Sequence, residues 1–190
     1  MSHTTTRREA ILQAQGFLQT NPLFLDTETT GLGPQAEIVE IGIVDDTGAD
    51  IFSSLVRPRG YMDADAARVH GITDAMLIGA PSWTEVWHSA LAVLEDRQVG
   101  VYNAEFDLRM LKQTNSRAWL SWTLLDENFF CLMKLYARFH GDWDSRRGSF
   151  RYQSLDKAGQ QCGISLPNAH RAVDDARLAR ALLHYMADQR

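Results

Sequence analysis

Phe24-Leu25-Asp26-Thr27-Glu28-Thr29-Thr30-Gly31-Leu32 is the stretch around which the rest of the chain is organised. Its apolar beginning predicts a buried strand, and its Thr-Gly pair predicts a turn. Side chains at positions i and i+2 of a strand point to the same side, so Asp26 and Glu28 are expected to share one face. Two neighbouring carboxylates repel each other unless a cation lies between them, and a divalent metal ion would meet that need. Such a pair also occurs by chance on solvated strand ends, so a metal site requires further ligands.

The composition is that of a single globular domain. The 190 residues are 45% hydrophobic and 23% charged, which is enough to bury a full core. No apolar run reaches the roughly 20 residues of a membrane-spanning helix, and the polar residues 1–8 lack the apolar centre of a secretory signal. We therefore expect a cytoplasmic protein with no membrane partner. The net charge of −5 argues against a cationic nucleic-acid coat but is compatible with an acidic metal site.

The order of the expected elements indicates an α/β protein. A first helix over residues 7–20, capped by Thr4, Thr5 and Thr6, precedes Pro22 and the acidic strand. We expect residues 1–21 to be a helical extension and residues 22–190 to form the main domain. Further strands are expected over 37–45, 51–56, 99–102 and 122–125, helices over 82–96, 105–114, 131–139, 155–162 and 172–187, and irregular chain over 58–81 and 140–151. A β meander followed by alternating helices and strands favours a mixed sheet.

A third acid follows the short apolar strand over 99–102, in the segment Asn103-Ala104-Glu105-Phe106-Asp107. The carboxyl ends of strands and the beginnings of helices gather at the functional edge of α/β folds, so Asp107 is a candidate ligand. The alternative is that Asp107 is a favourable charge in the first turn of a helix, worth up to about 1 kcal/mol.

The last expected helix supplies a fourth acid. At about 100° per residue, Asp175 falls inside the apolar sector, between the directions of Leu182 and Met186. Asp174 falls only at the edge of that sector. A carboxylate on the core-facing side of a helix is costly unless it is paired or bound to a metal. Asp175 therefore needs a partner from elsewhere in the chain.

His170 lies five residues before Asp175, where the last helix begins. A histidine at this position can cap the helix, fill space or lie exposed. Beside a metal cluster, a neutral imidazole is also well suited to take a proton from water.

Three motifs together resemble those of the DEDDh 3′–5′ exonucleases, a family that includes the proofreading epsilon subunit of bacterial DNA polymerase III, RNase T and oligoribonuclease. These motifs are Asp26-x-Glu28 with Thr30-Gly31-Leu32, Asn103-Ala-x-Phe106-Asp107, and His170-x-Ala172-x-x-Asp175-Ala176. The segment Val69-His70-Gly71-Ile72-Thr73 also resembles one found in the DNA-acting branch. The resemblance runs from about Leu23 to Met186. One departure is Tyr102-Asn103, where the family often has His-Asn.

The resemblance implies an RNase H-like fold, a five-stranded mixed sheet with helices on both faces. It also implies two-metal hydrolysis, in which Asp26, Glu28, Asp107 and Asp175 hold two Mg²⁺ or Mn²⁺ ions. Asp26 would contact both ions, and His170 would be the general base. All-oxygen ligation favours these ions over zinc. The expected reaction removes nucleoside 5′-monophosphates from the 3′ end of single-stranded or frayed DNA.

The family resemblance also implies contacts with the substrate. Leu32 would wedge against the terminal base, with backbone amides near Thr30 and Gly31 approaching its sugar. His70, Asn103 and Phe106 are secondary candidates, and core packing explains Phe106 equally well. Four arginines over 138–152, interleaved with Trp143, Phe150 and Tyr152, are suited to single-strand binding, but the two aspartates there fit a solvated loop as well.

Two other functions are alternatives to DNA exonuclease activity. The motifs are shared with enzymes that trim RNA or very short oligonucleotides, so RNA is an alternative substrate. A non-catalytic nucleic-acid or protein-binding module would be expected to have lost ligands, and none is lost here. The chain ends with the last helix, so we do not expect the polymerase partner of an epsilon subunit. Relatives include monomers and dimers, so the resemblance implies no oligomeric state.

Overall fold

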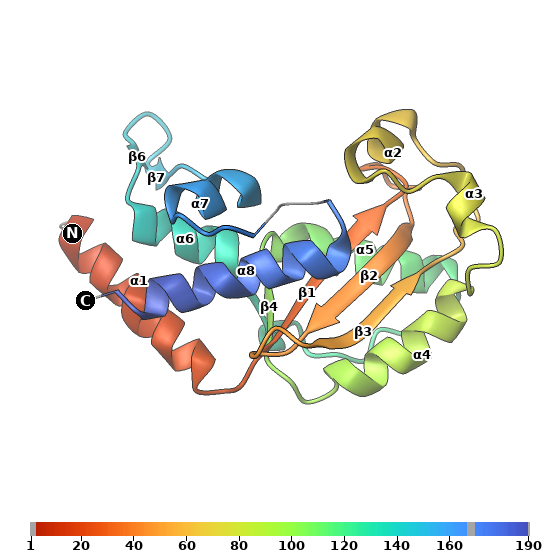
Figure 1. Cartoon of the computed structure of the whole chain (residues 1–190), viewed down its shortest axis with the longest axis horizontal. Helices are drawn as coiled ribbons and strands as arrows, with labels where there is room; N and C mark the ends of the chain where they lie inside the picture. The colour runs from red at the N-terminus through yellow and green to blue at the C-terminus, as the bar shows by residue number, and fades with distance from the viewer. Residues whose placement is uncertain (1–2, 167–169, 190) are drawn as a thin grey trace.

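A computed structural model describes residues 3–166 and 170–189 of the chain. It contains one five-stranded sheet flanked by helices, with a small hairpin at one end (Figure 1). In chain order the elements are α1 (His3–Leu18), β1 (Leu23–Thr29), β2 (Ile38–Val44), β3 (Asp50–Leu55), α2 (Ala64–His70), α3 (Asp74–Leu77), α4 (Trp83–Leu94), β4 (Val99–Val101), α5 (Ala104–Arg117), the 3₁₀ turn η1 (Asp126–Asn128), β5 (Phe129–Cys131), α6 (Leu132–His140), β6 (Trp143–Asp144), β7 (Ser149–Phe150), α7 (Leu155–Gln161) and α8 (Ala172–Ala187).

The sheet has the strand order β3-β2-β1-β4-β5. Strands β1, β2 and β3 form an antiparallel meander, while β4 pairs in parallel with β1 and β5 pairs in parallel with β4. The acidic strand β1 is therefore central, with neighbours on both sides. This arrangement confirms the expected α/β class and the RNase H-like mixed sheet.

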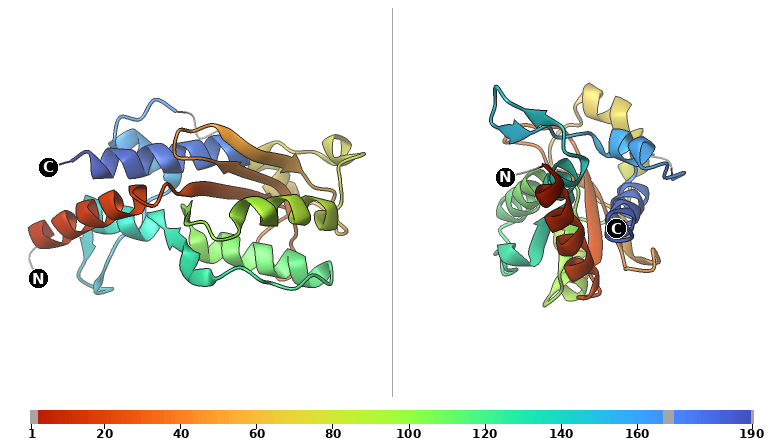
Figure 2. Two further views of the ribbon diagram at one scale, coloured as in Figure 1. Left: turned by 90° about the horizontal axis from the view of Figure 1, so that it is seen from below. Right: turned by 90° about the vertical axis from the view of Figure 1, so that its left-hand side faces the viewer.

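Two hydrophobic cores lie on opposite faces of the sheet, and Figure 2 shows the helical layers edge-on. Helix α8 covers one face and packs on α1, α6 and α7 beyond the end of the sheet, while α4 and α5 cover the other face. Strand β1 contributes to both cores, since Phe24 packs beneath α8 and Leu25 packs toward α4 and α5. Asp26 and Glu28 therefore face α8, because they lie two and four residues after Phe24 and the side chains of a strand alternate between its two faces.

The N-terminal helix α1 is packed against α6 and α8. The ring of Phe17 stacks on that of Phe130 with 3.8 Å between centroids, and Arg7 donates a hydrogen bond to the carbonyl oxygen of Phe139 at 2.8 Å. The expected threonine cap is wrong: α1 begins at His3, so residues 4–6 already have helical backbone and lie inside the helix. The division into an extension and a main domain stays a prediction.

The strand expected over 122–125 is also wrong. These residues lack strand pairing; Trp122 and Leu124 pack into the core beside α4 instead, and Leu125 is exposed. The ring of Trp122 stacks on Trp87 at 5.6 Å and also lies against Phe129. The edge strand is β5, a few residues further on, where we expected the beginning of a helix.

Two segments expected to be irregular contain short elements. Helices α2 and α3 occupy part of 58–81, and the hairpin β6–β7 occupies part of 140–151. Helix α2 ends at Gly71, whose φ of 70° lies in the left-handed region that favours glycine. Helices this short lack the long apolar periodicity on which sequence-based assignment depends.

Candidate active site

Strand β1 places the first two acids on one face of the sheet. Asp26 and Glu28 are half-buried and face α8, while Thr27 between them is buried on the opposite face. The antiparallel pairing of β1 with β2 runs through both residues, which fixes the direction of these side chains. The expectation that Asp26 and Glu28 share a face agrees with this geometry.

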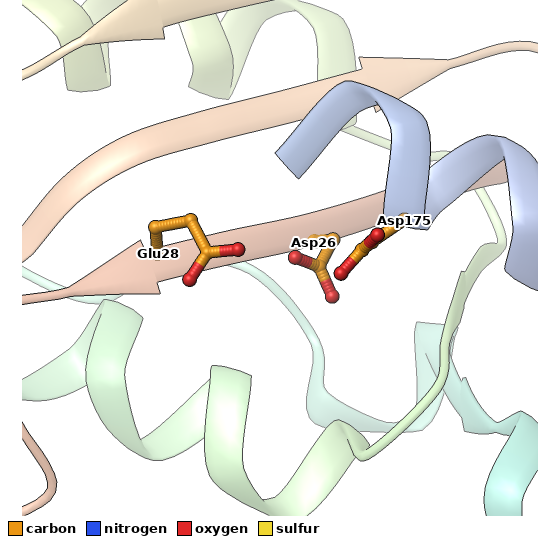
Figure 3. A group of neighbouring side chains, drawn as sticks. All are labelled: Asp26, Glu28 and Asp175. Atoms are coloured by element: carbon orange, nitrogen blue, oxygen red, sulfur yellow. The ribbon is translucent and has the colours of Figure 1, made fainter. Parts of the chain in front are cut away.

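Helix α8 brings the third acid to the same place. Asp175 is buried, and one carboxylate oxygen from each of Asp26, Glu28 and Asp175 lies within 4.8 Å of the other two. Figure 3 shows the three side chains extending from β1 and the first turn of α8 into a shared space. The adjacent Asp174 instead pairs with Arg177 at 3.0 Å and is partly exposed.

Asp107 lies outside this group of three. It is buried in the first turn of α5, and its Oδ1 accepts a hydrogen bond from the Thr27 hydroxyl at 2.8 Å. Asp107 nevertheless acts on the group electrostatically, because its charge helps to raise the pKa of Asp26. Thr27 is thus a link between the first and second acidic motifs that the sequence did not indicate.

The acids raise one another's pKa values. Burial, followed by the charges of Asp107, Glu28 and Asp175, holds the pKa of Asp26 well above its usual range. Burial and the charge of Asp175 raise the pKa of Glu28 to about 8. Burial raises the pKa of Asp107 to about 7. Without a compensating cation, the site therefore retains protons that ordinary carboxylic acids lose near pH 4.

These properties fit a divalent cation. The donors are carboxylate oxygens, the ligand type that Mg²⁺ and Mn²⁺ prefer. A bound cation would also offset the mutual repulsion that raises the pKa values of Asp26 and Glu28. The side chains in this group thus match the expected cofactor in chemistry, charge and proximity.

His170 lies at the edge of the acidic group. Its Nδ1 is 3.9 Å from Oδ2 of Asp175, and about half of its side chain is exposed. The residue has a φ of 48°, a left-handed conformation that is uncommon outside glycine and is often found at functional sites. The imidazole is thus close to the acids and also accessible to water.

A pocket of about 480 Å³ opens beside Glu28. This volume is within the range of roughly 300–1,000 Å³ typical of small-molecule sites. Of the predicted substrate contacts, Gly31, Leu32, His70 and Phe106 line the pocket. Leu32 is 76% exposed, an unusual environment for a leucine whose backbone follows a central strand.

The other predicted contacts have different surroundings. Thr30 is buried, and its hydroxyl accepts a hydrogen bond from the backbone of Glu37. Asn103 occupies the N-cap position of α5 without a capping hydrogen bond from its side chain, and it does not line the described pocket. A Cβ atom at Gly31 would lie 2.0 Å from Oδ2 of Asp63, so a larger residue in this turn would displace the Asp63 side chain.

His70 is held by backbone groups. Its Nε2 lies 3.2 Å from the carbonyl oxygen of Thr29, and its Nδ1 accepts a hydrogen bond from Ile72 at 3.0 Å. Burial lowers the pKa of His70, which favours the neutral ring. This histidine joins α2 to the end of β1 and presents part of its ring to the pocket.

Glu40 and Asp63 lie near the site, although the sequence pattern predicted no role for either residue. Glu40 is buried on β2 and forms a multiple hydrogen bond with Arg171, next to His170. The sequence did contain one sign that Glu40 has a role, because it is a charged residue among the apolar residues of a strand. Asp63 also lines the pocket, but the irregular segment that contains it gave no signal for this residue.

The arginine-rich segment over 138–152 forms the β6–β7 hairpin. Arg151 lies 3.5 Å from Asp144, and Arg147 lies 3.9 Å from the same carboxylate. Both interpretations of this segment, single-strand binding and a solvated loop, therefore agree with the structure, because the segment has exposed arginines whose charge Asp144 partly neutralises.

The fold and the site point to a nuclease class: an RNase H-like sheet that carries a cluster of carboxylates suited to divalent cations. Residues 23–183 match the RNase_T family, described as Exonuclease. Over 180 residues the chain is 34% identical to the uncharacterized exonuclease CP81 of Escherichia phage 186, covering 92% of each chain. It is 33% identical over 168 residues to the PolC-type DNA polymerase III of Thermotoga maritima, covering 85% of this chain and 12% of the polymerase.

Solved structures agree with this assignment. Exonuclease X in complex with 5′ overhanging duplex DNA is 28% identical, with a TM-score of 0.61 over 86% of this chain and 90% of that chain. A 3′-exonuclease that recognises the histone mRNA stem-loop is 16% identical, with a TM-score of 0.70 over 89% and 64%, and supports the fold alone. The chain belongs to the DEDDh family and is a 3′–5′ exonuclease. Enzymes of this family depend on metal ions.

Across residues 3–166 and 170–189, none of the helices combines the length and apolar character needed to cross a membrane.

Proposed function

We propose that this exonuclease removes nucleoside 5′-monophosphates from the 3′ end of single-stranded or frayed DNA. The observation that carries the proposal is the convergence of Asp26, Glu28 and Asp175 within 4.8 Å, with His170 beside Asp175 and a nucleotide-sized pocket beside Glu28. Each of these features has a distinct task in phosphodiester hydrolysis.

The acids are the proposed metal ligands. Asp26, Glu28 and Asp175, with Asp107 directly or through water, would hold two Mg²⁺ or Mn²⁺ ions, which when bound stabilise negative charge on the attacking and leaving oxygens. Asp26 is central to this set, because the charges of Asp107, Glu28 and Asp175 all act on it.

His170 is the proposed general base. It takes a proton from the attacking water, whose oxygen forms a bond to phosphorus while the bond to the 3′ oxygen of the preceding nucleotide breaks. The departing oxygen takes a proton from solvent and becomes the new 3′ hydroxyl. Partial exposure of His170 lets the imidazole return its proton to solvent between cycles.

The pocket beside Glu28 is the proposed place of the terminal nucleotide. Leu32 and Phe106 supply apolar surface for the base, and the turn at Gly31 lets backbone approach the sugar. A leucine that is mostly exposed in the free protein gains burial when a base packs on it, at about 25 cal/mol for each Å² covered.

Two observations favour DNA over RNA. Exonuclease X, which is 28% identical to this chain, was solved in complex with 5′ overhanging duplex DNA, and the PolC relative is a DNA polymerase. The segment around Val69-His70-Gly71, which resembles the DNA-acting branch, also lines the proposed nucleotide pocket.

The test uses matched DNA and RNA oligonucleotides labelled at the 5′ or the 3′ end. With Mg²⁺ or Mn²⁺, we expect stepwise shortening of 5′-labelled DNA and early release of labelled mononucleotide from 3′-labelled DNA. Asp26→Asn should abolish both. Faster degradation of RNA would replace the proposed substrate, and full activity of Asp26→Asn would refute the proposed ligand set.

A further inference from the structure

Strand β2 carries two residues directly beside the acids of β1. Gly42 is the cross-strand partner of Asp26. Glu40 is the cross-strand partner of Glu28. Opposed residues of neighbouring strands point to the same face, so β2 contributes a glycine and a carboxylate to the surface on which α8 begins.

Gly42 lets α8 approach the sheet closely. A Cβ atom at this position would lie 2.4 Å from the backbone nitrogen of Val173 and 2.6 Å from the carbonyl carbon of Ala172. Real side chains do not come so near backbone atoms, so the first turn of α8 rests directly on the β2 backbone. The absence of a side chain at Gly42 therefore determines how closely the first turn of α8 approaches the sheet beside the acids.

Glu40 fixes the same turn by hydrogen bonds. Its Oε1 accepts from Nε of Arg171 at 3.0 Å and also from Nη2, and its Oε2 accepts from Nε at 3.1 Å. Oε2 additionally accepts from the backbone nitrogen of Ala172 at 2.9 Å. The Glu40 side chain on β2 thus accepts a hydrogen bond from the first turn of α8, a task that the helix's own N-cap residue usually performs.

This arrangement is more specific than helix packing requires. The Glu40 side chain is only 5% exposed, and burying a carboxylate is costly even when it is paired. The apolar face of α8 already holds the helix on the sheet. A bidentate pair with a planar guanidinium adds direction, because it fixes both the position and the orientation of Arg171.

We propose that Glu40 is a positioning residue that acts through Arg171 on His170. His170 directly precedes Arg171 and is held in a left-handed conformation, 3.9 Å from Asp175. The Glu40–Arg171 pair fixes the backbone on one side of His170 and so keeps the imidazole at the acidic group. This inference rests on the general-base role proposed above.

Two single variants test it, because they change the local charge in opposite directions. Glu40→Gln leaves the Arg171 guanidinium without its anionic partner, and Arg171→Ala leaves the Glu40 carboxylate without its cation. If position is what matters, both should lower kcat on a DNA oligonucleotide at least about tenfold, with KM changed less than about threefold. A purely electrostatic effect on the acids would move the two variants in opposite directions and overturn the proposal.

Glu37→Gln is the matched control. Glu37 is also buried on the chain leading into β2, pairs with Arg117 at 3.2 Å and accepts backbone hydrogen bonds from Arg59 and Gly60. The loss of a buried Glu–Arg pair is common to both substitutions, but only Glu40 contacts the residue next to His170. Glu37→Gln should lower the melting temperature and leave kcat within about twofold. An equal fall in kcat for Glu37→Gln and Glu40→Gln would mean that the loss of any buried Glu–Arg pair lowers activity, and it would overturn the proposal.

A double-mutant cycle separates this proposal from the general-base role. In the His170→Ala background, Glu40→Gln should cause little further loss of kcat, because both changes affect the same group. A further tenfold loss would refute action through His170. Full activity of His170→Ala alone would instead refute the general-base role. Calorimetric titration with Mn²⁺ should show unchanged affinity in Glu40→Gln, and a collapse of metal binding would also overturn the proposal.

Discussion

Asp174 and Asp175 are adjacent in sequence and yet lie in different environments. One residue of helical rotation, about 100°, separates a carboxylate that pairs with Arg177 from one that is buried beside Asp26 and Glu28. The helical pattern distinguished them because a carboxylate on the core-facing side of a helix is costly to bury, whereas an acid at the edge of the apolar face is tolerated.

The first prediction compares these two neighbours. Asp175→Asn should lower kcat by more than the roughly 10–100-fold that loss of a residue outside the ligand shell typically costs. Asp174→Asn should change it less than threefold, because Asp174 faces Arg177. Initial rates on 5′-labelled DNA at saturating Mg²⁺ measure both. Equal losses in the two variants would contradict the assignment of Asp175.

The second prediction concerns His170. His170→Ala should lose roughly 10²–10⁴-fold in kcat, the usual contribution of a general base. Its Mn²⁺ affinity should stay near that of the wild type, since the carboxylates within 4.8 Å of one another are unchanged. Calorimetric titration measures the affinity. Loss of metal binding would make His170 a ligand and exclude the general-base role.

At the residue scale, the acidic cluster was predictable from the sequence but the support around it was not. Asp26, Glu28 and Asp175 each follow from a local rule, either strand alternation or helical rotation. Thr27 and Glu40 hold Asp107 and Arg171 through contacts that span 80 and 131 residues. No local rule indicates which partner such a distant side chain will meet.

Among the elements, long periodic segments were predicted well and short ones poorly. Helix α8 has the expected bounds, because its apolar stripe continues over sixteen residues. Strand β5 has only three residues, and Trp122 in the preceding apolar run packs on α4 instead of pairing. In so short a segment, tertiary packing decides between strand and loop.

The third prediction tests the N-terminal helix. Phe17→Ala should reduce the free energy of unfolding by about 1–3 kcal/mol, less than the full cost of a buried phenylalanine because Phe17 is half-buried. The lost stack is the one with Phe130. Leu12→Ala on the exposed side of α1 is the control and should cost less than about 0.5 kcal/mol. Denaturant unfolding measures both.

That prediction also bears on the domain division. If α1 is an extension in function, Phe17→Ala should retain the wild-type kcat at a temperature where the variant is fully folded. A loss of kcat in the folded variant would make α1 part of the exonuclease domain.

For the whole molecule, the acidic cluster makes folding depend on pH and metal together. In the metal-free protein, burial and mutual repulsion raise the pKa of Glu28 to about 8 and that of Asp107 to about 7. The unfolded chain has ordinary values near 4. A raised pKa means that the folded state binds protons more tightly, so these groups stabilise the folded state below pH 4 and lose this contribution as the pH rises toward 8.

The fourth prediction follows from this sign. The metal-free protein should lose on the order of 2–4 kcal/mol of unfolding free energy between pH 5 and pH 8. Mg²⁺ or Mn²⁺ should restore stability mainly at pH 8, where protons compete least, by about 2.7 kcal/mol at a concentration 100 times the dissociation constant. Asp26→Asn removes the acid on which the other charges act most, so the stability of this variant should vary less with pH and respond less to metal than that of the wild type. Denaturant unfolding of both proteins at pH 5 and pH 8, with and without metal, measures these differences. A wild-type protein whose metal-free stability is the same at pH 5 and pH 8 would contradict the mutual repulsion on which the proposed metal site depends.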